Sequence, residues 1–134
     1  MNGRKILIDT SIWIDYFKNK SSGIAEKVDE MLTADEVYVP KIVIAELIQR
    51  AKSEREVSVI EEFVDAFHIV DQGADTWIKA GKLSFSLKKK GKNINLSDCY
   101  IAVIAQEYGC HIFTLDRHFE EIQKLFDIHL MMSS

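Results

Sequence analysis

The chain has 134 residues, of which 47% are hydrophobic, so it is long enough for one domain with a packed core and too apolar to stay disordered. No apolar run approaches the ~20 residues of a membrane span, and Asp9 and Asp15 interrupt the apolar N-terminal stretch, so we expect neither a membrane anchor nor a signal peptide. The net charge of −4 provides no general attraction to nucleic acid, although it is compatible with a local basic patch.

Short β-branched or aromatic runs alternate with longer amphipathic patterns through the first half of the chain. The short runs predict strands, and apolar residues three and four positions apart predict helices. Pro40, a residue favoured near helix starts, supports one of these helices. In chain order, the predicted elements are a strand at 5–9, a helix that begins near Ser11, a helix at 21–35, a strand at 36–40 and helices at 40–53 and 56–67.

The second half of the chain continues this alternation and adds signals for helix ends. Gly91 and Gly109 each follow a helical pattern, as is common at helix C-termini, and Ser97 is a predicted N-cap. In chain order, the predicted elements are a strand at 67–71, helices at 76–91 and 97–109, a strand at 110–116, a helix at 116–126 and, as the weakest prediction, a strand at 127–132.

Strands that alternate with helices are typical of α/β proteins with a parallel sheet. We therefore expect an α/β/α sandwich, in which a mainly parallel central sheet of about five strands is flanked by helices on both faces. The single proline, the six glycines and the absence of an internal repeat favour one domain over residues 1–134.

Acidic residues occur at positions that such a sheet would bring together. Asp9 follows the first predicted strand, Asp116 closes the fourth, and Asp98 opens the helix that precedes the fourth. Because ligands bind at the carboxyl ends of parallel strands, we expect these three acids at one edge of the sheet. Glu46 lies within the apolar segment IVIAELI, so its carboxylate should be partly shielded or face a cleft.

Each acid also has an ordinary structural explanation. Asp9 or Asp116 could cap the helix that follows it, and Asp98 could favour a helix N-terminus through the dipole. Glu46 could pair with Arg50, one helical turn later. The joint pattern is harder to explain in this way, because no cluster of Lys or Arg is placed to neutralise the acids. Packed carboxylates tend to bind protons or hard cations such as Mg²⁺ or Mn²⁺.

Four segments of the chain resemble the signature segments of a known family. They are ILIDTSIWIDYF, VPKIVIAELIQ, LSDCYIAVIAQEYG and IFTLDRHFEEI. In their order and spacing they are similar to those of PIN-domain ribonucleases, and the chain length and the order of the acids resemble VapC-type toxins of type II toxin–antitoxin pairs. All four acidic positions of the pattern are filled, and Thr114 matches the usual hydroxyl two residues before Asp116.

The resemblance implies a PIN-like fold and a metal-dependent endonuclease that hydrolyses phosphodiester bonds in RNA. Asp9 and Asp98 would be the principal ligands of Mg²⁺ or Mn²⁺, and Asp116 would hold a second ion or an ordered water. Glu46 would position or deprotonate the attacking water.

Other polar residues near these acids have expected supporting or surface positions. Ser11 and Thr114 would hydrogen-bond to the carboxylates or to water around the metal. His111, His118 and His129 are expected on strand or helix surfaces, with no role as nucleophiles.

The densest basic run lies shortly before Asp98 and consists of Lys88, Lys89, Lys90 and Lys92. These lysines could bind RNA, or they could complement the dipole at a helix C-terminus, and both roles can coexist. The resemblance further implies a homodimer and a cognate antitoxin whose basic or aromatic tail enters the acidic cleft.

The chain contains two cysteines, Cys99 and Cys110. If the segment between them is mostly helical, they lie roughly 13 Å or more apart, at about 1.5 Å per residue. A disulfide needs Cα atoms within ~7 Å, so we expect free thiols and a reducing, cytoplasmic location.

Two other functions are compatible with an acidic site at the edge of a sheet. The first is a PIN-type nuclease for RNA maturation or DNA processing without an antitoxin, and a small antitoxin reading frame beside the gene would argue against it. The second is a receiver-like signalling module, which also binds Mg²⁺ through acids at strand ends. The glutamate within a helix and the lack of a matching lysine after a late strand disfavour the receiver.

Overall fold

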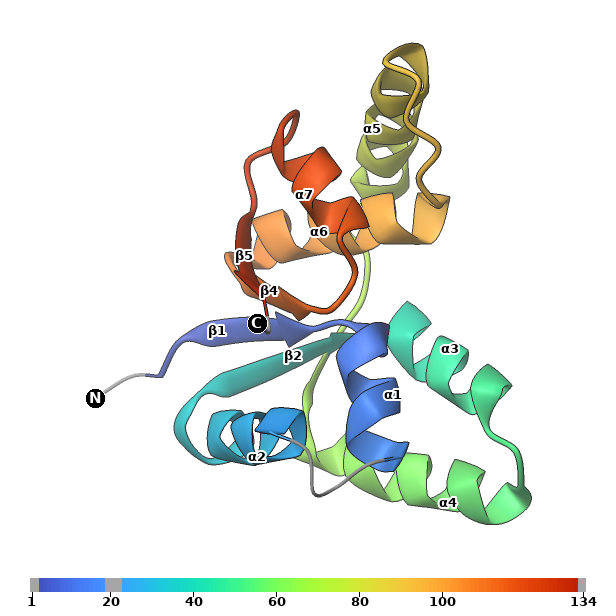
Figure 1. Ribbon diagram of the computed structural model, residues 1–134, viewed down its shortest axis with the longest axis vertical. Helices are drawn as coiled ribbons and strands as arrows, with labels where there is room; N and C mark the ends of the chain where they lie inside the picture. Colours follow the sequence, from blue (N-terminus) through green and yellow to red (C-terminus); the bar gives the residue numbers. More distant parts are fainter. Residues whose placement is uncertain (1–2, 19–22, 133–134) are drawn as a thin grey trace.

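The computed structural model describes residues 3–18 and 23–132, and within these it contains a five-stranded, all-parallel sheet with helices on both faces (Figure 1). The strands lie side by side in the order β3-β2-β1-β4-β5. Their bounds are β1 (Lys5–Ile8), β2 (Glu36–Pro40), β3 (His68–Val70), β4 (His111–Thr114) and β5 (His129–Met132). All five predicted strands are therefore confirmed, including the weakest, at the C-terminal end.

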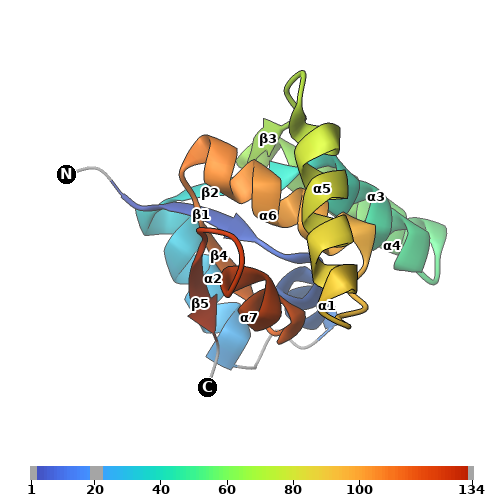
Figure 2. The same cartoon turned by 90° about the horizontal axis from the view of Figure 1, so that it is seen from above.

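Two groups of helices cover the opposite faces of this sheet. Figures 1 and 2 show the first four helices on one face and the last three on the other. The first group is α1 (Thr10–Lys18), α2 (Gly23–Ala34), α3 (Lys41–Arg50) and α4 (Glu54–Phe63), followed by a 3₁₀ turn (Val64–Ala66); the second is α5 (Thr76–Lys89), α6 (Leu96–Tyr108) and α7 (His118–Gln123). The predicted α/β/α sandwich is confirmed.

The core is built around β1, the central strand. Ile6, Leu7 and Ile8 are fully buried, because β1 pairs with a strand on each side and has helices over both faces. Leu7 is aligned with Tyr38 of β2 and Ile112 of β4. Strands covered on both faces read as continuous apolar runs, which is why KILI was recognisable in the sequence.

Helix α6 is the most deeply buried helix of the second layer. Every residue from Asp98 to Ala105 is buried. Gly109 ends the helix in the left-handed conformation, with φ of 69°, as the sequence predicted. The predicted N-cap, Ser97, is wrong by two positions, because α6 begins at Leu96 and Asn95 occupies the N-cap.

Other helix boundaries differ from the sequence prediction at their ends. The helix expected at 56–67 becomes α4 and the 3₁₀ turn, and the helix expected at 116–126 is shortened to α7. The first two residues of the helix expected at 21–35 lie outside the described residues. These differences do not move the acidic residues from the elements on which they were expected.

Both cysteines are free and buried, which confirms the expected absence of a disulfide between them. Burial raises the pKa of each thiol to about 11, so neither is a reactive thiolate near neutral pH. None of the helices in the described residues combines the length and the apolar character needed to cross a membrane.

Sheet topology places the point where the strand order changes direction next to β1, and the region beyond the carboxyl ends of β1 and β4 is called the crevice below. From β1 the chain moves through β2 to β3 in one direction, and it then crosses to β4 and β5 on the other side of β1. In open parallel sheets, ligands bind beyond the carboxyl ends of the strands at this reversal of direction. The residues that follow β1 and β4 are therefore the first to examine for function.

Candidate active site

Asp9 joins the end of β1 to the start of α1. Its carbonyl oxygen accepts hydrogen bonds from the N–H groups of Ile12 and Trp13, at 3.1 and 3.3 Å, so Asp9 stands at the N-cap position of α1. Its carboxylate faces β4 as well, because Oδ2 accepts hydrogen bonds from the hydroxyls of Ser11 and Thr114, each at 2.9 Å. Burial raises the pKa of this carboxyl, and the two hydroxyls oppose the rise. Asp9 is thus a helix cap by position and a buried acid of the crevice.

Thr114, the last residue of β4, links two of the predicted acids. Its hydroxyl donates to Asp9 Oδ2 and accepts a hydrogen bond from the backbone N–H of Asp116 at 2.9 Å. Ser11 Oγ similarly accepts from the backbone N–H of Leu115 at 3.0 Å. Because Thr114 is fully buried, these bonds fix the carboxyl ends of β1 and β4 relative to each other.

Asp98 enters the crevice from the first turn of α6 and is 8% exposed. Burial raises the pKa of its carboxyl to about 6, and the negative charges of Asp116 and Asp9 act in the same direction. The neighbouring His118 opposes this rise. Asp98, Asp116 and Asp9 come from different elements, and the charges of the latter two add to the effect of burial on Asp98.

Asp116 and His118 form a group of possible metal ligands with Asp98. His118 Nδ1 lies 3.4 Å from Asp116 Oδ1 and 3.6 Å from Asp98 Oδ2. One donor atom from each of these three residues lies within 4.8 Å of the other two. The carboxylate of Asp116 also accepts a hydrogen bond from the backbone N–H of His118, but Arg117 and not Asp116 occupies the N-cap of α7.

Glu46 projects from α3 and is half-buried. Its Oε1 accepts a hydrogen bond from the Thr10 hydroxyl at 2.8 Å, which connects α3 to the first turn of α1, next to Asp9. Among the ion pairs of the described residues, none joins Glu46 to Arg50, so the structure does not support the alternative in which the two pair along the helix. The carboxylate is therefore held next to the crevice.

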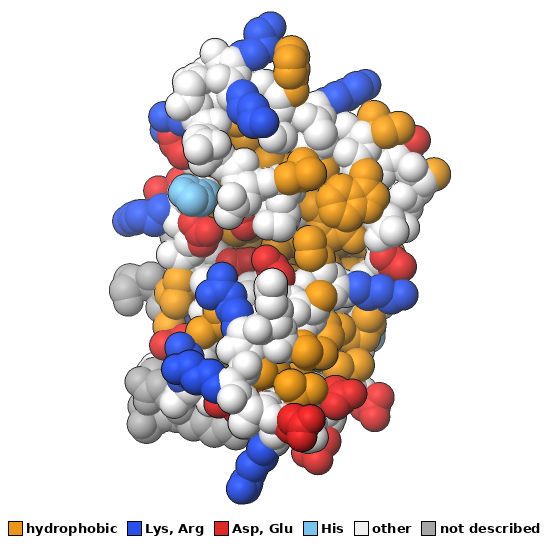
Figure 3. Space-filling view, turned by 90° about the vertical axis from the view of Figure 1, so that its right-hand side faces the viewer, with side chains coloured by type: hydrophobic (Ala, Val, Ile, Leu, Met, Phe, Trp, Pro, Cys, Tyr) orange, Lys and Arg blue, Asp and Glu red, His pale blue; other side chains and the backbone are white. Residues whose placement is uncertain are grey.

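The predicted acids thus gather at one edge of the sheet. Figure 3 shows acidic side chains across the middle of one face, with a histidine beside them and apolar side chains above and below. Within residues 3–18 and 23–132, no Lys or Arg forms an ion pair with Asp9, Asp98 or Asp116. Carboxylates without a Lys or Arg partner suit a divalent ion, because hard cations prefer oxygen ligands.

Sequence reasoning missed two residues of this site. Thr10, which holds Glu46, carries no signal beyond its place after Asp9. His118 was expected on a helix surface; its side chain is indeed half exposed, at 52%, but Nδ1 faces two carboxylates. The only sequence signal for His118 is its position two residues after Asp116, where a helix begins.

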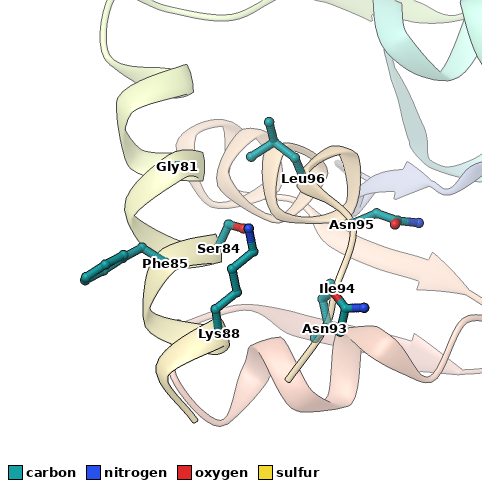
Figure 4. Close-up of a pocket in the computed structure, with 8 residues that line it drawn as sticks. All are labelled: Gly81, Ser84, Phe85, Lys88, Asn93, Ile94, Asn95 and Leu96. Atoms are coloured by element: carbon teal, nitrogen blue, oxygen red, sulfur yellow. The ribbon is translucent and has the colours of Figure 1, made fainter. Parts of the chain in front are cut away.

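The basic run lies at and just after the C-terminal end of α5, and all four lysines are exposed. Lys92 forms an ion pair with Glu121 of α7 at 2.7 Å. Lys88 lines a pocket of about 450 Å³ between α5 and the segment before α6, together with Gly81, Ser84, Phe85 and residues 93–96 (Figure 4). The run therefore borders the segment that leads directly to Asp98.

The raised pKa of Asp98 predicts how pH affects the stability of the metal-free protein. The ordinary value is 3.8 and the folded-state value is about 6, so the folded state holds a proton that the unfolded state has released between these values. The contribution of the Asp98 carboxyl to the free energy of unfolding is fully present below about pH 4, and it is lost as pH rises through about 6. We expect the Tm of metal-stripped protein to show this fall, measured by thermal melting across that range.

Two variants separate Asp98 from the other titrating groups. Asp98→Asn should flatten the fall in Tm, whereas Glu62→Gln, at an exposed position on α4, should leave it unchanged. An identical pH dependence in Asp98→Asn and the wild type would contradict the repulsion described above.

Comparisons with known proteins agree with this geometry. A family model described as the PIN domain matches residues 6–125. The chain is 31% identical to "Ribonuclease VapC1" of Methanocaldococcus jannaschii over 121 residues, which cover 90% of this chain and 82% of that protein. It is 29% identical to "tRNA(fMet)-specific endonuclease VapC" of Shigella flexneri over 123 residues, with coverages of 88% and 92%. The solved structure of VapBC-1 from nontypeable Haemophilus influenzae matches with a TM-score of 0.77 and 25% identity, covering 96% of this chain and 97% of that chain.

Proposed function

The chain belongs to the PIN-domain family, and from that premise we propose that it is a metal-dependent RNA endonuclease, the toxin of a toxin–antitoxin pair. The proposal treats residues 1–134 as a single PIN-like domain, of which the family match covers 6–125. Relatives that carry the names ribonuclease and endonuclease support RNA as the substrate. The observation that carries the chemistry is the convergence of Asp9, Asp98 and Asp116 without a Lys or Arg partner among the described residues.

Three carboxylates would hold the cation. Asp9 and Asp98 are the proposed principal ligands of Mg²⁺ or Mn²⁺, and Asp116 would bind a second ion or an ordered water. A divalent ion at this place would neutralise phosphate oxygens and lower the pKa of a water molecule. Ser11 and Thr114 support the proposal, because their hydroxyls bind one oxygen of Asp9 and so fix the direction in which its carboxylate points.

Glu46 is the proposed group that positions and deprotonates the attacking water. Its hydrogen bond from Thr10 holds the carboxylate beside the first turn of α1, which begins directly after Asp9. A half-buried carboxylate retains contact with solvent, from which the water enters. The carboxylate would accept the proton that the water loses as its oxygen attacks the phosphorus atom, while the P–O bond to the leaving ribose oxygen breaks and that oxygen takes a proton from solvent.

The substrate would be held by the local basic run. RNA is a polyanion, and the chain as a whole carries a charge of −4, so binding requires a local excess of positive charge. Lys88, Lys89, Lys90 and Lys92 are the proposed RNA-binding residues. Lys88 lines the pocket beside the start of α6, which supports a path for the phosphate backbone toward Asp98.

The proposed partners follow from the same family membership. They are a cognate antitoxin, whose basic or aromatic tail would enter the acidic crevice, and a second copy of this chain. The full-length match to VapBC-1 supports the first of these. The buried free thiols of Cys99 and Cys110 are consistent with a reducing compartment, and we propose the cytoplasm as the location.

We expect growth to stop when this chain is expressed alone, and to recover when a small protein encoded beside it is expressed with it. Sequencing of cellular RNA ends would then identify new cleavage sites that are absent with Glu46→Gln. Normal growth with abundant, folded and RNA-active protein would favour a nuclease for RNA maturation. Growth arrest without new RNA ends would contradict the nuclease proposal itself.

A further inference from the structure

An imidazole nitrogen lies beside two acids of the site. His118 Nδ1 is 3.4 Å from an oxygen of Asp116 and 3.6 Å from an oxygen of Asp98. The roles proposed above use both acids and leave the histidine without a function. We propose that His118 is a nitrogen ligand of the bound divalent ion and that it makes the site select Mn²⁺ over Mg²⁺. This inference rests on the proposed function, because it concerns the same metal site.

The local backbone directs this side chain toward the acids. The backbone N–H of His118 donates to Asp116 Oδ1 at 2.9 Å, so the start of α7 is tied to the carboxylate that the imidazole also faces. The Asp98 side chain approaches from α6 and is largely buried. One donor atom each from α6, from α7 and from the segment after β4 therefore lies within 4.8 Å of the other two.

The other histidines of the chain occupy the opposite edge of the sheet. His68, His111 and His129 are the first residues of β3, β4 and β5, so they lie at the amino ends of parallel strands. The acids lie beyond the carboxyl ends. Position at the carboxyl edge thus distinguishes His118 from the three other imidazoles. Any of those three can serve as a control in the experiments.

A nitrogen donor changes which ion the site prefers. Mg²⁺ strongly favours oxygen ligands and gives up its water reluctantly, whereas imidazole is a good ligand for first-row transition metals. A site of three carboxylates would bind Mg²⁺ and Mn²⁺ on similar terms. If the nitrogen of His118 replaces one oxygen donor, the affinity for Mn²⁺ rises more than the affinity for Mg²⁺, so the site favours Mn²⁺.

A competing role for His118, as a counter-ion, predicts a different change in metal affinity. If its imidazolium served only as a counter-ion for Asp98 and Asp116, it would compete with every divalent cation to the same extent. Removal of the side chain would then tighten the binding of Mg²⁺ and Mn²⁺ equally. If His118 is instead a ligand, its removal weakens the binding of Mn²⁺ more than the binding of Mg²⁺. The ratio of the two dissociation constants therefore distinguishes a ligand from a counter-ion.

The binding experiment compares metal-stripped wild type, His118→Gln and His129→Gln. Free Mn²⁺ is measured by electron paramagnetic resonance during titration, and Mg²⁺ is measured by competition with Mn²⁺. We expect His118→Gln to bind Mn²⁺ about tenfold or more weakly, with a smaller change for Mg²⁺. His129→Gln, at an exposed position in β5, should match the wild type. Equal changes for both ions in His118→Gln would overturn the inference.

A spectroscopic measurement on the wild type does not depend on any variant. Protein labelled with ¹⁵N-histidine and loaded with Mn²⁺ should show a nitrogen hyperfine coupling of a directly bound imidazole in electron spin-echo modulation. The coupling should disappear in His118→Gln and persist in His129→Gln. Absence of this coupling in the wild type would show that the inference is wrong.

Cleavage of RNA by the same samples separates the two proposals. RNA cleavage without nitrogen coupling would overturn the role of His118 and leave the proposed nuclease intact. Nitrogen coupling without cleavage by either ion would support His118 as a ligand and contradict the nuclease. Both signals together, with Mn²⁺ bound more tightly than Mg²⁺, are the expected result.

Discussion

Replacement of Asp9 by Asn is expected to reduce RNA cleavage by more than about 100-fold while the fold is retained, since even residues that only support metal ligands contribute about 10- to 100-fold. The substitution removes one negative charge from the site and barely changes the shape of the side chain. Asn caps helices about as well as Asp, so α1 should still form. The amide oxygen can still accept the hydrogen bonds that Ser11 and Thr114 now donate to Asp9.

The same variant should be at least as heat-stable as the wild type when metal is absent. The charge of Asp9 contributes to the raised pKa of Asp98, so its removal relieves repulsion inside the crevice. Cleavage rate and thermal melting, with and without added metal, are the two measurements. Asp127→Asn, at an exposed position after α7, is the matched control and should change neither. A fully active Asp9→Asn protein would mean that Asp9 is only a helix cap.

Replacement of Thr114 by Val is expected to weaken metal binding and slow RNA cleavage by about 10- to 100-fold. Val keeps the shape of the fully buried Thr114 side chain but has no hydroxyl. Asp9 then loses a hydrogen-bond donor, and the backbone N–H of Asp116 loses its acceptor. The two acids are no longer held in fixed relative positions, although every charge of the site is still present.

The dissociation constant for Mn²⁺ and the rate of RNA cleavage measure this effect. Thr33→Val is a suitable control, because the Thr33 hydroxyl is exposed and donates within α2, to the carbonyl oxygen of Asp29. Unchanged metal binding in Thr114→Val would show that the link between β1 and β4 does not position the site.

The fold could be predicted because each of its elements leaves a local pattern. Strands covered on both faces appear as short apolar runs such as KILI, and helices with one exposed face show apolar residues three and four apart. Helix ends were less predictable, because Asn95 rather than Ser97 occupies the N-cap of α6. The Asn95 side chain makes no capping hydrogen bond, so the start of α6 does not follow from the capping preference on which the prediction rested.

The acidic positions could be predicted from the rule for carboxyl ends of parallel strands, but their contacts could not. The link from Thr114 to Asp9 joins residues 105 positions apart, and the link from Thr10 to Glu46 spans 36. Such pairs carry no signal in a single sequence. His118 was missed for the same reason, because its contact with Asp98 depends on how α6 and α7 pack.

The most direct test of the account is cleavage of an end-labelled structured RNA by one purified preparation before and after removal of divalent metal. The account predicts that complete chelation stops cleavage and that restored Mn²⁺ or Mg²⁺ recovers it, because no Lys or Arg among the described residues pairs with Asp9, Asp98 or Asp116 to balance their charge. Cleavage that continues undiminished after complete chelation would contradict it.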